Sequence, residues 1–290
     1  MGATDASVGT GADAAWAGAR CEGADDPDKS RTFIVREYDF AIPEDGKSLG
    51  VDIDGVDGTD AKTGIGCGKD DLVSPDGQKG IDNGMGPIWG MFLQILGEAM
   101  AQGLQQAAVH DGRTIMLLRL EGVDDEENDD CTDIRTLTGA GQPLIGSDGE
   151  ILPGQTFAVD DMRSASFGRG WIRDGRVHAE ADELTLEANL GRYTFVNTFH
   201  TATVEFDLDL DGIHAMLAGG LDADAAVEAA LKEAEFGEAQ SLAPAIPGII
   251  HGAADLAPDA DGTCTQVSTV VIFDAVPVFI EADAPRVDDP

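Results

Sequence analysis

The chain has 290 residues, with 55 acidic and 18 basic side chains that give a formal net charge of -37. Hydrophobic residues make up 42% of the sequence, which is enough for a folded core, so the composition excludes global disorder. The charge argues against binding to nucleic acid or to an anionic lipid surface, and it favours cations and basic partners. Asp is the residue of turns and hard-cation sites, and here it outnumbers Glu. Adaptation to concentrated salt is an alternative that fits an acidic, Lys-poor sequence equally.

The two ends of the chain differ in composition from the middle. Residues 1–20 are rich in Gly, Ala, Ser and Asp, which is typical of a flexible tether. Residues 285–290 form an acidic, Pro-bearing tail, and we expect a single β-rich domain over residues 21–284. No apolar run is long enough for a transmembrane helix. We expect Met1 to replace a removed export signal, which places the protein outside the cell, in the periplasm or at the cell surface.

Alternating and continuous apolar runs predict strands along most of the chain. The Asp174-Gly175 pair between two such runs is a strong hairpin signal. Val51 and Ile53 fall on one face of a short run, with acidic residues on the other. The last run contains Pro277, so it predicts either a strand pair or a long strand broken at that proline. The predicted strands cover residues 31–42, 49–54, 113–120 and 267–280, with a meander over 164–211.

Three segments have the apolar spacing of helices. Pro87 stands where a helix begins, and the pattern that follows predicts a long helix over about 86–108. Asp222 or Asp224 can cap a second helix that ends near Phe236, and a third is expected at 246–254. We therefore expect an α+β, mainly β fold: an antiparallel sheet or sandwich with a long core helix. A lipid-lined pocket beside this helix is the alternative reading of its apolar face, with Trp89, Met91 and Phe92 as candidate pocket residues.

The segment 55–84, with the acidic run before it, is the strongest candidate for a metal site. It is dense in Gly and Asp and too long for an ordinary connection, so we expect it to be functional or organised by a metal. Calcium takes six to eight oxygen ligands, and Gly lets the backbone turn tightly enough to present them. The spacing does not match an EF-hand, and a plain turn-rich loop is the alternative. The candidate ligands are Asp52, Asp54, Asp57, Asp60, Asp70, Asp71, Asp76, Asp82 and Asn83.

Two further acidic groups are weaker candidates for calcium. Asp207, Asp209 and Asp211 precede a glycine, as in the opening half of an EF-hand loop. They also alternate with apolar residues, so an amphipathic strand with one wet face is the favoured interpretation. Asp259 and Asp261 form a similar turn before Cys264.

Four widely spaced cysteines favour two structural disulfides. No Cys-x-x-Cys pair is present, which argues against zinc, a redox motif or haem attachment. Four cysteines allow three connectivities, of which we favour Cys67 with Cys131 and Cys21 with Cys264. Buried free thiols in a cytosolic protein are the alternative.

The sequence gives little support to catalysis. It contains no Gly-x-Ser-x-Gly elbow and no closely spaced histidine pair of the zinc type. The run Gly64-x-Gly66-x-Gly68 lacks the ending of a phosphate-binding loop. Carboxylate-pair chemistry on a glycan stays open, because acidic residues are frequent throughout the chain.

Two stretches carry a family resemblance. From Cys67-Gly68 through Gly80-Ile81-Asp82-Asn83, and again from Gly262-Thr263-Cys264 through Val278, the chain resembles uncharacterised acidic secreted lipoproteins of predatory soil and marine bacteria. In that family the Gly-Ile-Asp-Asn segment follows an Asp-x-Asp-Gly strand end, as Asp52-Ile53-Asp54-Gly55 does here. The resemblance covers most of residues 21–284 and implies export and a common fold, but no activity.

These observations together predict a secreted or surface-tethered calcium-binding protein with a non-enzymatic binding or scaffolding role. We expect its partners to be divalent cations and another surface protein, a glycan or a lipid. The alternatives are a secreted hydrolase that acts on a glycan and a carrier of a lipid or another hydrophobic ligand.

Overall fold

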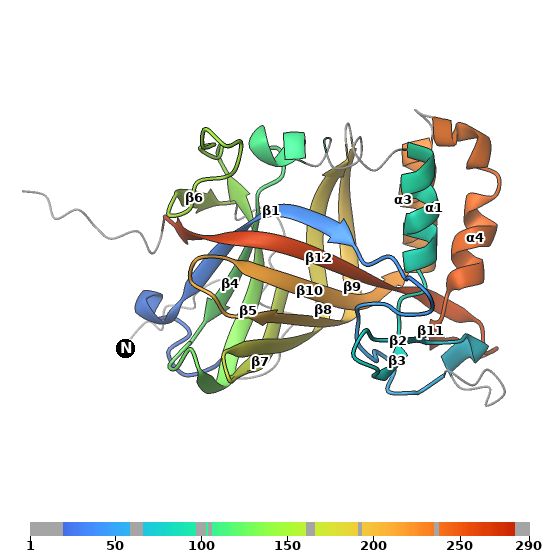
Figure 1. Cartoon of the computed structure of the whole chain (residues 1–290), viewed down its shortest axis with the longest axis horizontal. Helices are drawn as coiled ribbons and strands as arrows, with labels where there is room; N and C mark the ends of the chain where they lie inside the picture. Colours follow the sequence, from blue (N-terminus) through green and yellow to red (C-terminus); the bar gives the residue numbers. More distant parts are fainter. Residues whose placement is uncertain are drawn as a thin grey trace, which may run out of the picture.

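The chain folds around a closed, eight-stranded antiparallel β-barrel (Figure 1). The computed structural model describes residues 20–58, 66–96, 103, 106–160, 166–190, 193–234 and 238–281. Around the barrel the strand order is β1, β4, β5, β7, β8, β9, β10, β12 and back to β1. The strands are β1 (Arg31–Phe40), β4 (Met116–Glu121), β5 (Asn128–Ala140), β7 (Ser166–Arg173), β8 (Arg176–Leu190), β9 (Tyr193–Asp207), β10 (Ile213–Asp222) and β12 (Cys264–Ile280).

The pairing of β1 with β12 closes the barrel. The register runs from Thr32 opposite Val278 to Phe40 opposite Val271, with one irregularity between Val35 and Glu37. Because the first and last long strands pair with each other, each barrel strand has a neighbouring strand on both sides.

Alternation of side chains explains how these sequences form a barrel. Val177 and Ala179 on β8 are buried in the interior cluster, whereas His178 and Glu180, which alternate with them, lie on the outer face. The same period of two places Phe33 of β1 in the interior. The barrel interior is therefore the main hydrophobic core.

Three helices, α1 (Gly86–Leu96), α3 (Ala223–Ala234) and α4 (Ile246–Ala253), gather at one end of the barrel (Figure 1). Ile88 of α1 and Ile250 of α4 belong to the same buried cluster as the barrel interior. The helices thus close this end of the core with their apolar faces. Short 3₁₀ turns are η1 (Pro27–Lys29), η3 (Gly66–Gly68) and η4 (Glu238–Leu242).

Shorter strands complete the fold. A two-stranded hairpin consists of β2 (Leu72–Val73) and β3 (Lys79–Ile81), and β11 (Leu256–Pro258) pairs with β12. All three lie at the helical end of the barrel (Figure 1). At the other end, β6 (Thr156–Val159) pairs with both β12 and β5.

The predicted sandwich with a long core helix is wrong. The strands form a barrel because β1 and β12 pair across almost the whole chain, a contact that local periodicity does not encode. Of the helix predicted over 86–108, the structure describes α1 (Gly86–Leu96), which packs over one end of the barrel, and helical residues at 103 and 106–108. Residues 97–102, 104 and 105 of the predicted helix lie outside the described residues.

Several local predictions are confirmed. Asp174 and Gly175 join β7 to β8 with φ angles of 49° and 75°, the left-handed pair of a type I′ hairpin. Asp222 caps α3, because its Oδ1 accepts the N–H of Ala225 at 2.8 Å. The helix predicted at 246–254 is α4.

Two predicted strands differ from the structure. Residues 49–54 form no strand, and residues 49, 53 and 54 are bends, although Val51 and Ile53 do pack on one side. The last strand is not broken at Pro277, which lies within β12 opposite Phe33. Its carbonyl, the backbone hydrogen-bonding group that proline retains, accepts the N–H of Gly154 at 2.8 Å.

Both predicted cysteine pairings are wrong, although two disulfides do form. Cys21 pairs with Cys131 and Cys67 pairs with Cys264, with Cα–Cα distances of 5.6 and 6.0 Å. The first pair fastens the segment before β1 to the outer face of the barrel, where the N–H of Cys21 also donates to buried Asp133 at 3.0 Å. The second pair fastens η3 to the first residue of β12.

Candidate cation site

The acidic run Asp52 to Asp54 is held against the outer face of the barrel by the residues that alternate with it. Val51 and Ile53 pack on a small cluster that includes Ala218 of β10 and Val270 of β12. Asp52 and Asp54 alternate with these two residues, and their carboxylates accept backbone N–H groups of Gly55 and Val56 rather than packing on this cluster. The alternation in the sequence therefore fixes which side chains are available to a ligand.

The end of β3 brings Asp82 to the same place. The N–H of Asp82 donates to the carbonyl of Val51 at 3.1 Å, which sets the two segments side by side. Gly80 has φ +78°, and a Cβ there would lie 3.2 Å from Oδ2 of Asp52. A glycine is needed at this position both for its left-handed backbone and for the close approach of Asp52.

Asp52, Asp54 and Asp82 form a three-carboxylate cluster, which we call the Asp triad. Each offers an oxygen that lies within 4.8 Å of the other two. Backbone N–H groups orient all three: Oδ2 of Asp82 accepts from Ile53 at 2.7 Å, and Oδ1 of Asp52 accepts from Gly55 at 2.7 Å. Oδ1 of Asp54 accepts from Val56 at 2.9 Å. The geometry provides several hard oxygen ligands from two chain segments, as a divalent cation requires.

Burial makes the Asp triad electrostatically costly in the absence of a counter-ion. Asp82 is only 3% exposed, and this burial, followed by the nearby charges of Asp54, Asp255 and Asp71, raises its pKa to about 8. Burial also raises the pKa of Asp54, with Asp52 adding to the effect. The charges that act most strongly on Asp82 are all negative, so a bound cation or a proton would relieve the repulsion.

Asp71 adds a further carboxylate to this region. Its Oδ2 accepts the N–H of Gly58 at 2.5 Å, which closes the base of the loop between them. Burial raises its pKa, and the charges of Asp54, Asp52 and Asp57 raise it further. Asp71 and Asp57 therefore lie in the electrostatic neighbourhood of the Asp triad.

A buried pair from another part of the fold supports the segment that carries Asp82. Asp255, 7% exposed, accepts the N–H of Ser268 at 2.7 Å and the Ser268 hydroxyl at 2.5 Å. The same hydroxyl accepts the N–H of Gly84 at 2.6 Å. Burial raises the pKa of Asp255 to about 6 despite these bonds. Sequence reasoning missed the roles of Ser268 and Asp255; the position of Asp255 between Ala254 and Leu256 was the available signal of its burial.

The other residues predicted in the 52–83 segment are not brought to the Asp triad by any described contact. Asp60 lies outside the described residues. Asp70 is exposed, and Asp76 hydrogen-bonds to Ser74 in the β2–β3 turn. Asn83 is 3% exposed and donates to the carbonyl of Ala41 at 2.7 Å and to Ser48 Oγ at 2.8 Å. Its amide therefore ties the loop after β1 to the loop after β3.

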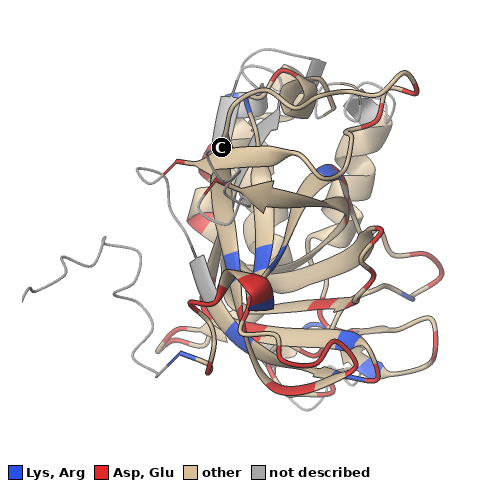
Figure 2. Ribbon diagram, turned by 90° about the vertical axis from the view of Figure 1, so that its left-hand side faces the viewer, with Lys and Arg blue, Asp and Glu red and all other residues tan. Residues whose placement is uncertain are grey.

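The two weaker acidic groups form separate turns. Asp207 ends β9, and Oδ1 of Asp209 accepts the N–H of Asp211 at 2.9 Å in the loop before β10. Oδ1 of Asp259 likewise accepts the N–H of Asp261 at 2.9 Å in the loop between β11 and β12. Acidic residues are in fact spread along many loops of the barrel (Figure 2), which is why sequence spacing alone does not single out the Asp triad.

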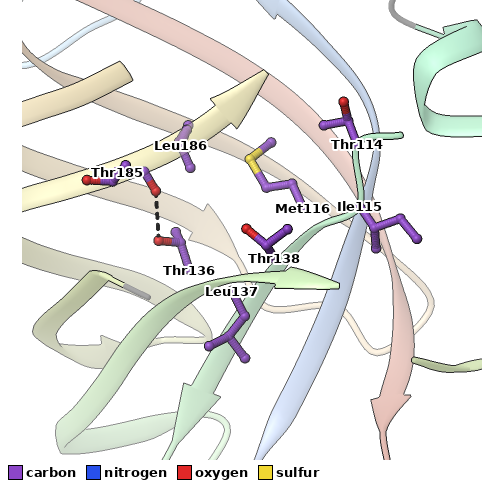
Figure 3. Close-up of a pocket in the computed structure, with 8 residues that line it drawn as sticks. All are labelled: Thr114, Ile115, Met116, Thr136, Leu137, Thr138, Thr185 and Leu186. Carbon is purple, nitrogen blue, oxygen red and sulfur yellow. Dashed lines mark hydrogen bonds between the residues drawn. The ribbon is translucent and has the colours of Figure 1, made fainter. Parts of the chain in front are cut away.

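Trp89, Met91 and Phe92, the candidate pocket residues, pack against the core. The Trp89 ring stacks on Phe40 at 3.8 Å between centroids. A cavity of about 10 Å³ lies elsewhere, between β4, β5 and β8 (Figure 3), where the Thr136 hydroxyl donates to the Thr185 carbonyl. A second cavity of about 10 Å³ lies inside the barrel. Each has room for about one water molecule, so neither supports a lipid carrier.

Comparison with known proteins adds no further assignment. No protein-family model, curated protein or solved structure matches the chain. Within the described residues, the helices lack the length and hydrophobicity of a membrane span. The fold and the Asp triad thus define the molecule at the level of class: a disulfide-linked β-barrel with a candidate cation site on its outer face, beside its helical end.

Proposed function

We propose that this chain is an exported or surface-tethered protein that binds calcium at the Asp triad, as a structural ion in a non-enzymatic binding or scaffolding role. The observation that carries the proposal is the convergence of Asp52, Asp54 and Asp82 within 4.8 Å of one another. Three like charges at this distance repel one another unless a cation or protons compensate them.

The chemistry of the donors favours calcium over softer metals. All three groups are carboxylates, which are hard oxygen ligands, whereas zinc sites in proteins draw mainly on Cys and His. Calcium also accepts carbonyl and water ligands in irregular geometry, which suits an extended loop better than the near-octahedral demand of magnesium. The two disulfides support export, because such bonds persist in oxidising compartments.

A structural role follows from where the ligands come from. Asp52 and Asp54 precede the loop that contains η3, and Asp82 follows the β2–β3 hairpin, so an ion would join the two ends of a long irregular segment. The barrel needs no ion to close, because the pairing of β1 with β12 completes the ring of strands. Calcium would therefore order the segment 52–83 on a barrel that is already formed.

A glycan hydrolase is the less favoured function. Retaining glycosidases place two carboxyl groups about 5 to 5.5 Å apart beside a cleft that admits the sugar. Asp82 is 3% exposed, and it lines neither of the two cavities found among the described residues. The partner in the scaffolding role would be another surface protein, a glycan or a lipid.

The test is thermal unfolding with calcium, magnesium or chelator at fixed ionic strength. Calcium that binds only the native state stabilises it by about 2.7 kcal/mol at one hundred times Kd. Asp54→Asn should remove most of this gain. The matched control is Asp209→Asn, because Asp209 makes the same bond to the N–H two residues on, but far from the Asp triad.

Two results would refute the proposal. The first is a melting temperature that is the same in calcium and in chelator. The second is an equal response to sodium chloride at matched ionic strength, which would assign the acidity to salt adaptation.

A further inference from the structure

The disulfide between Cys67 and Cys264 joins the segment that carries the candidate ligands to the strand that supports them. Cys67 lies in η3, between Gly58 and Asp71, whose hydrogen bond closes the base of this loop. Cys264 begins β12, on the same strand as Ser268. One covalent bond therefore connects two chain regions whose side chains meet around Asp82.

Few other described contacts hold this part of the loop to the barrel. Lys69 Nζ donates to the carbonyl of Gly252 at 2.6 Å, in an exposed position where such a bond is weak. Gly66–Gly68 also lies against β11. Among the described residues, the disulfide of Cys67 and the bond of Asp71 to Gly58 are therefore the main attachments of residues 66–71.

Electrostatic repulsion opposes this arrangement. Asp71 lies near enough to Asp52, Asp54 and Asp57 for their charges to raise its pKa. The Cys67–Cys264 disulfide holds Asp71 near these like charges before the ion binds. The ion therefore does not have to supply the free energy needed to bring the carboxylates together. Without the disulfide, repulsion would move Asp71 away from the Asp triad. Part of the free energy of calcium binding would then be used to bring Asp71 back.

The two disulfides differ at one cysteine in their exposure to solvent. Cys67, Cys264 and Cys131 are all half-buried, whereas Cys21 is 6% exposed. A thiolate must reach a sulfur atom to open a disulfide, and the Cys67–Cys264 bond offers a soluble dithiol two half-buried cysteines where the Cys21–Cys131 bond offers one.

We propose that the Cys67–Cys264 disulfide is a redox switch for cation affinity at the Asp triad, and this inference rests on the proposed function. A dithiol reductant supplies two electrons and two protons. The S–S bond breaks, Cys67 and Cys264 become thiols, and the reductant becomes a disulfide. The oxidised protein binds calcium tightly and the reduced protein binds it weakly.

Linkage makes the switch reciprocal. If reduction weakens calcium binding about tenfold, which is within the usual range of coupling between two sites, calcium must favour the disulfide by the same factor. For this two-electron couple, a tenfold change corresponds to a reduction potential about 30 mV more negative in calcium.

The experiment is a calcium titration of four samples: the oxidised protein, the same protein after mild dithiol treatment, Cys67→Ser with Cys264→Ser, and Cys21→Ser with Cys131→Ser. Alkylation and mass spectrometry establish which thiols are free in the treated sample. We expect about tenfold weaker binding in the second and third samples, and a change of less than about twofold in the fourth. The fourth sample is the matched control, because its disulfide lies away from the Asp triad.

The outcomes separate the two proposals. If the oxidised protein binds no calcium, the proposed function itself fails. If it binds calcium but the affinity is unchanged after reduction, only the switch fails. Equal loss in both double variants would also overturn the switch, because it would show general destabilisation. If the Cys67/Cys264 variant does not fold, the reduction potential of the natural protein with and without calcium decides the question, and an unchanged potential rejects the switch.

Discussion

The carboxylate of Asp82 accepts the backbone N–H of Ile53 at 2.7 Å, across 29 positions of the sequence. This bond joins the two halves of the Asp triad, because Ile53 stands between Asp52 and Asp54. The apolar side chain of Ile53 packs on the barrel, and its N–H faces the acid. A single residue therefore anchors the site to the core and orients one of its ligands.

The substitution Asp82→Asn separates the charge of Asp82 from its hydrogen bond. Asparagine keeps an oxygen that can accept the N–H of Ile53, but it removes a buried negative charge. In chelator at neutral pH we expect a gain of about 1 kcal/mol in the free energy of unfolding, because burial and the nearby carboxylates make the ionisable group of Asp82 costly to place there and the amide avoids that cost. In calcium the variant should lose the added stability of the natural protein. Denaturant unfolding in both conditions checks this, and a variant less stable in chelator would contradict it.

The substitution Gly80→Ala tests the close approach of Asp52. Ala at φ +78° costs about 1 kcal/mol for the backbone alone, and its Cβ would press on Oδ2 of Asp52 at 3.2 Å. The control is Gly77→Ala, at φ +99°, where a Cβ meets open space. Both variants should be destabilised, but only Gly80→Ala should also bind calcium more weakly. Equal calcium affinities in the two variants would show that the approach of Asp52 is unimportant.

The substitution Ser268→Ala tests the support beneath Asp82. It removes the hydroxyl that binds Asp255 and accepts the N–H of Gly84, so two buried polar groups lose a partner. Each such loss costs about 1 to 3 kcal/mol, and unfolding in urea should show a loss in that range. The control on the same strand is Thr265→Ala, whose exposed hydroxyl donates to the carbonyl of Ala257. We expect a change below about 0.5 kcal/mol for the control, and similar losses in both variants would contradict the assignment.

Local sequence patterns predict a useful part of this molecule. The alternation of Val51 and Ile53 with Asp52 and Asp54 indicates one apolar and one acidic face, and the structure packs the apolar face on the barrel. The Asp174-Gly175 pair specifies its hairpin because both positions need a left-handed backbone. These features depend on residues that are close in sequence.

Features that depend on contacts between residues far apart in the sequence could not be predicted from local patterns. The closure of β1 on β12 distinguishes a barrel from a sandwich, but both folds use the same alternating strands. The partners of Cys67 and Cys21 depend on which loops the barrel brings together, and spacing gives no information on this.

The ligands of the candidate cation site were likewise predicted only in part. Asp52, Asp54 and Asp82 belong to the predicted ligand set, but so do Asp70 and Asp76, which the described contacts place elsewhere. An aspartate in a Gly-rich segment looks the same in the sequence whether it faces an ion site or solvent. Burial separates them, because Asp82 is 3% exposed while Asp70 and Asp76 are exposed. Burial follows from the tertiary fold and not from spacing.

A pair between β8 and β9 on the outer face of the barrel should make stability depend on pH. His178 Nδ1 lies 2.8 Å from Glu205, and its ring stacks on Trp171 with centroids 5.0 Å apart. The bond to His178, with help from Arg176, lowers the pKa of Glu205 to about 2. The same bond, with a further contribution from Glu180, raises the pKa of His178.

The signs of these two shifts define a pH window. The contribution of Glu205 is present above its ordinary pKa of 4.5 and is lost as the pH falls through about 2. The contribution of His178 is complete below its ordinary pKa of 6.5 and is lost as the pH rises through its higher folded-state value. The charged pair therefore stabilises the fold most between pH 4.5 and 6.5.

The substitution His178→Gln should remove this dependence, because glutamine can hydrogen-bond to Glu205 but carries no charge. We expect a loss of about 0.5 to 1 kcal/mol at pH 5.5 that shrinks toward pH 9, measured by urea unfolding across the range. The control is His214→Gln, whose histidine lies 3.0 Å from Asp274 in an exposed position where solvent screens the pair. A loss that does not change between pH 5.5 and 9 would show that His178 acts through packing on Trp171, and the charge of the pair would then contribute nothing measurable.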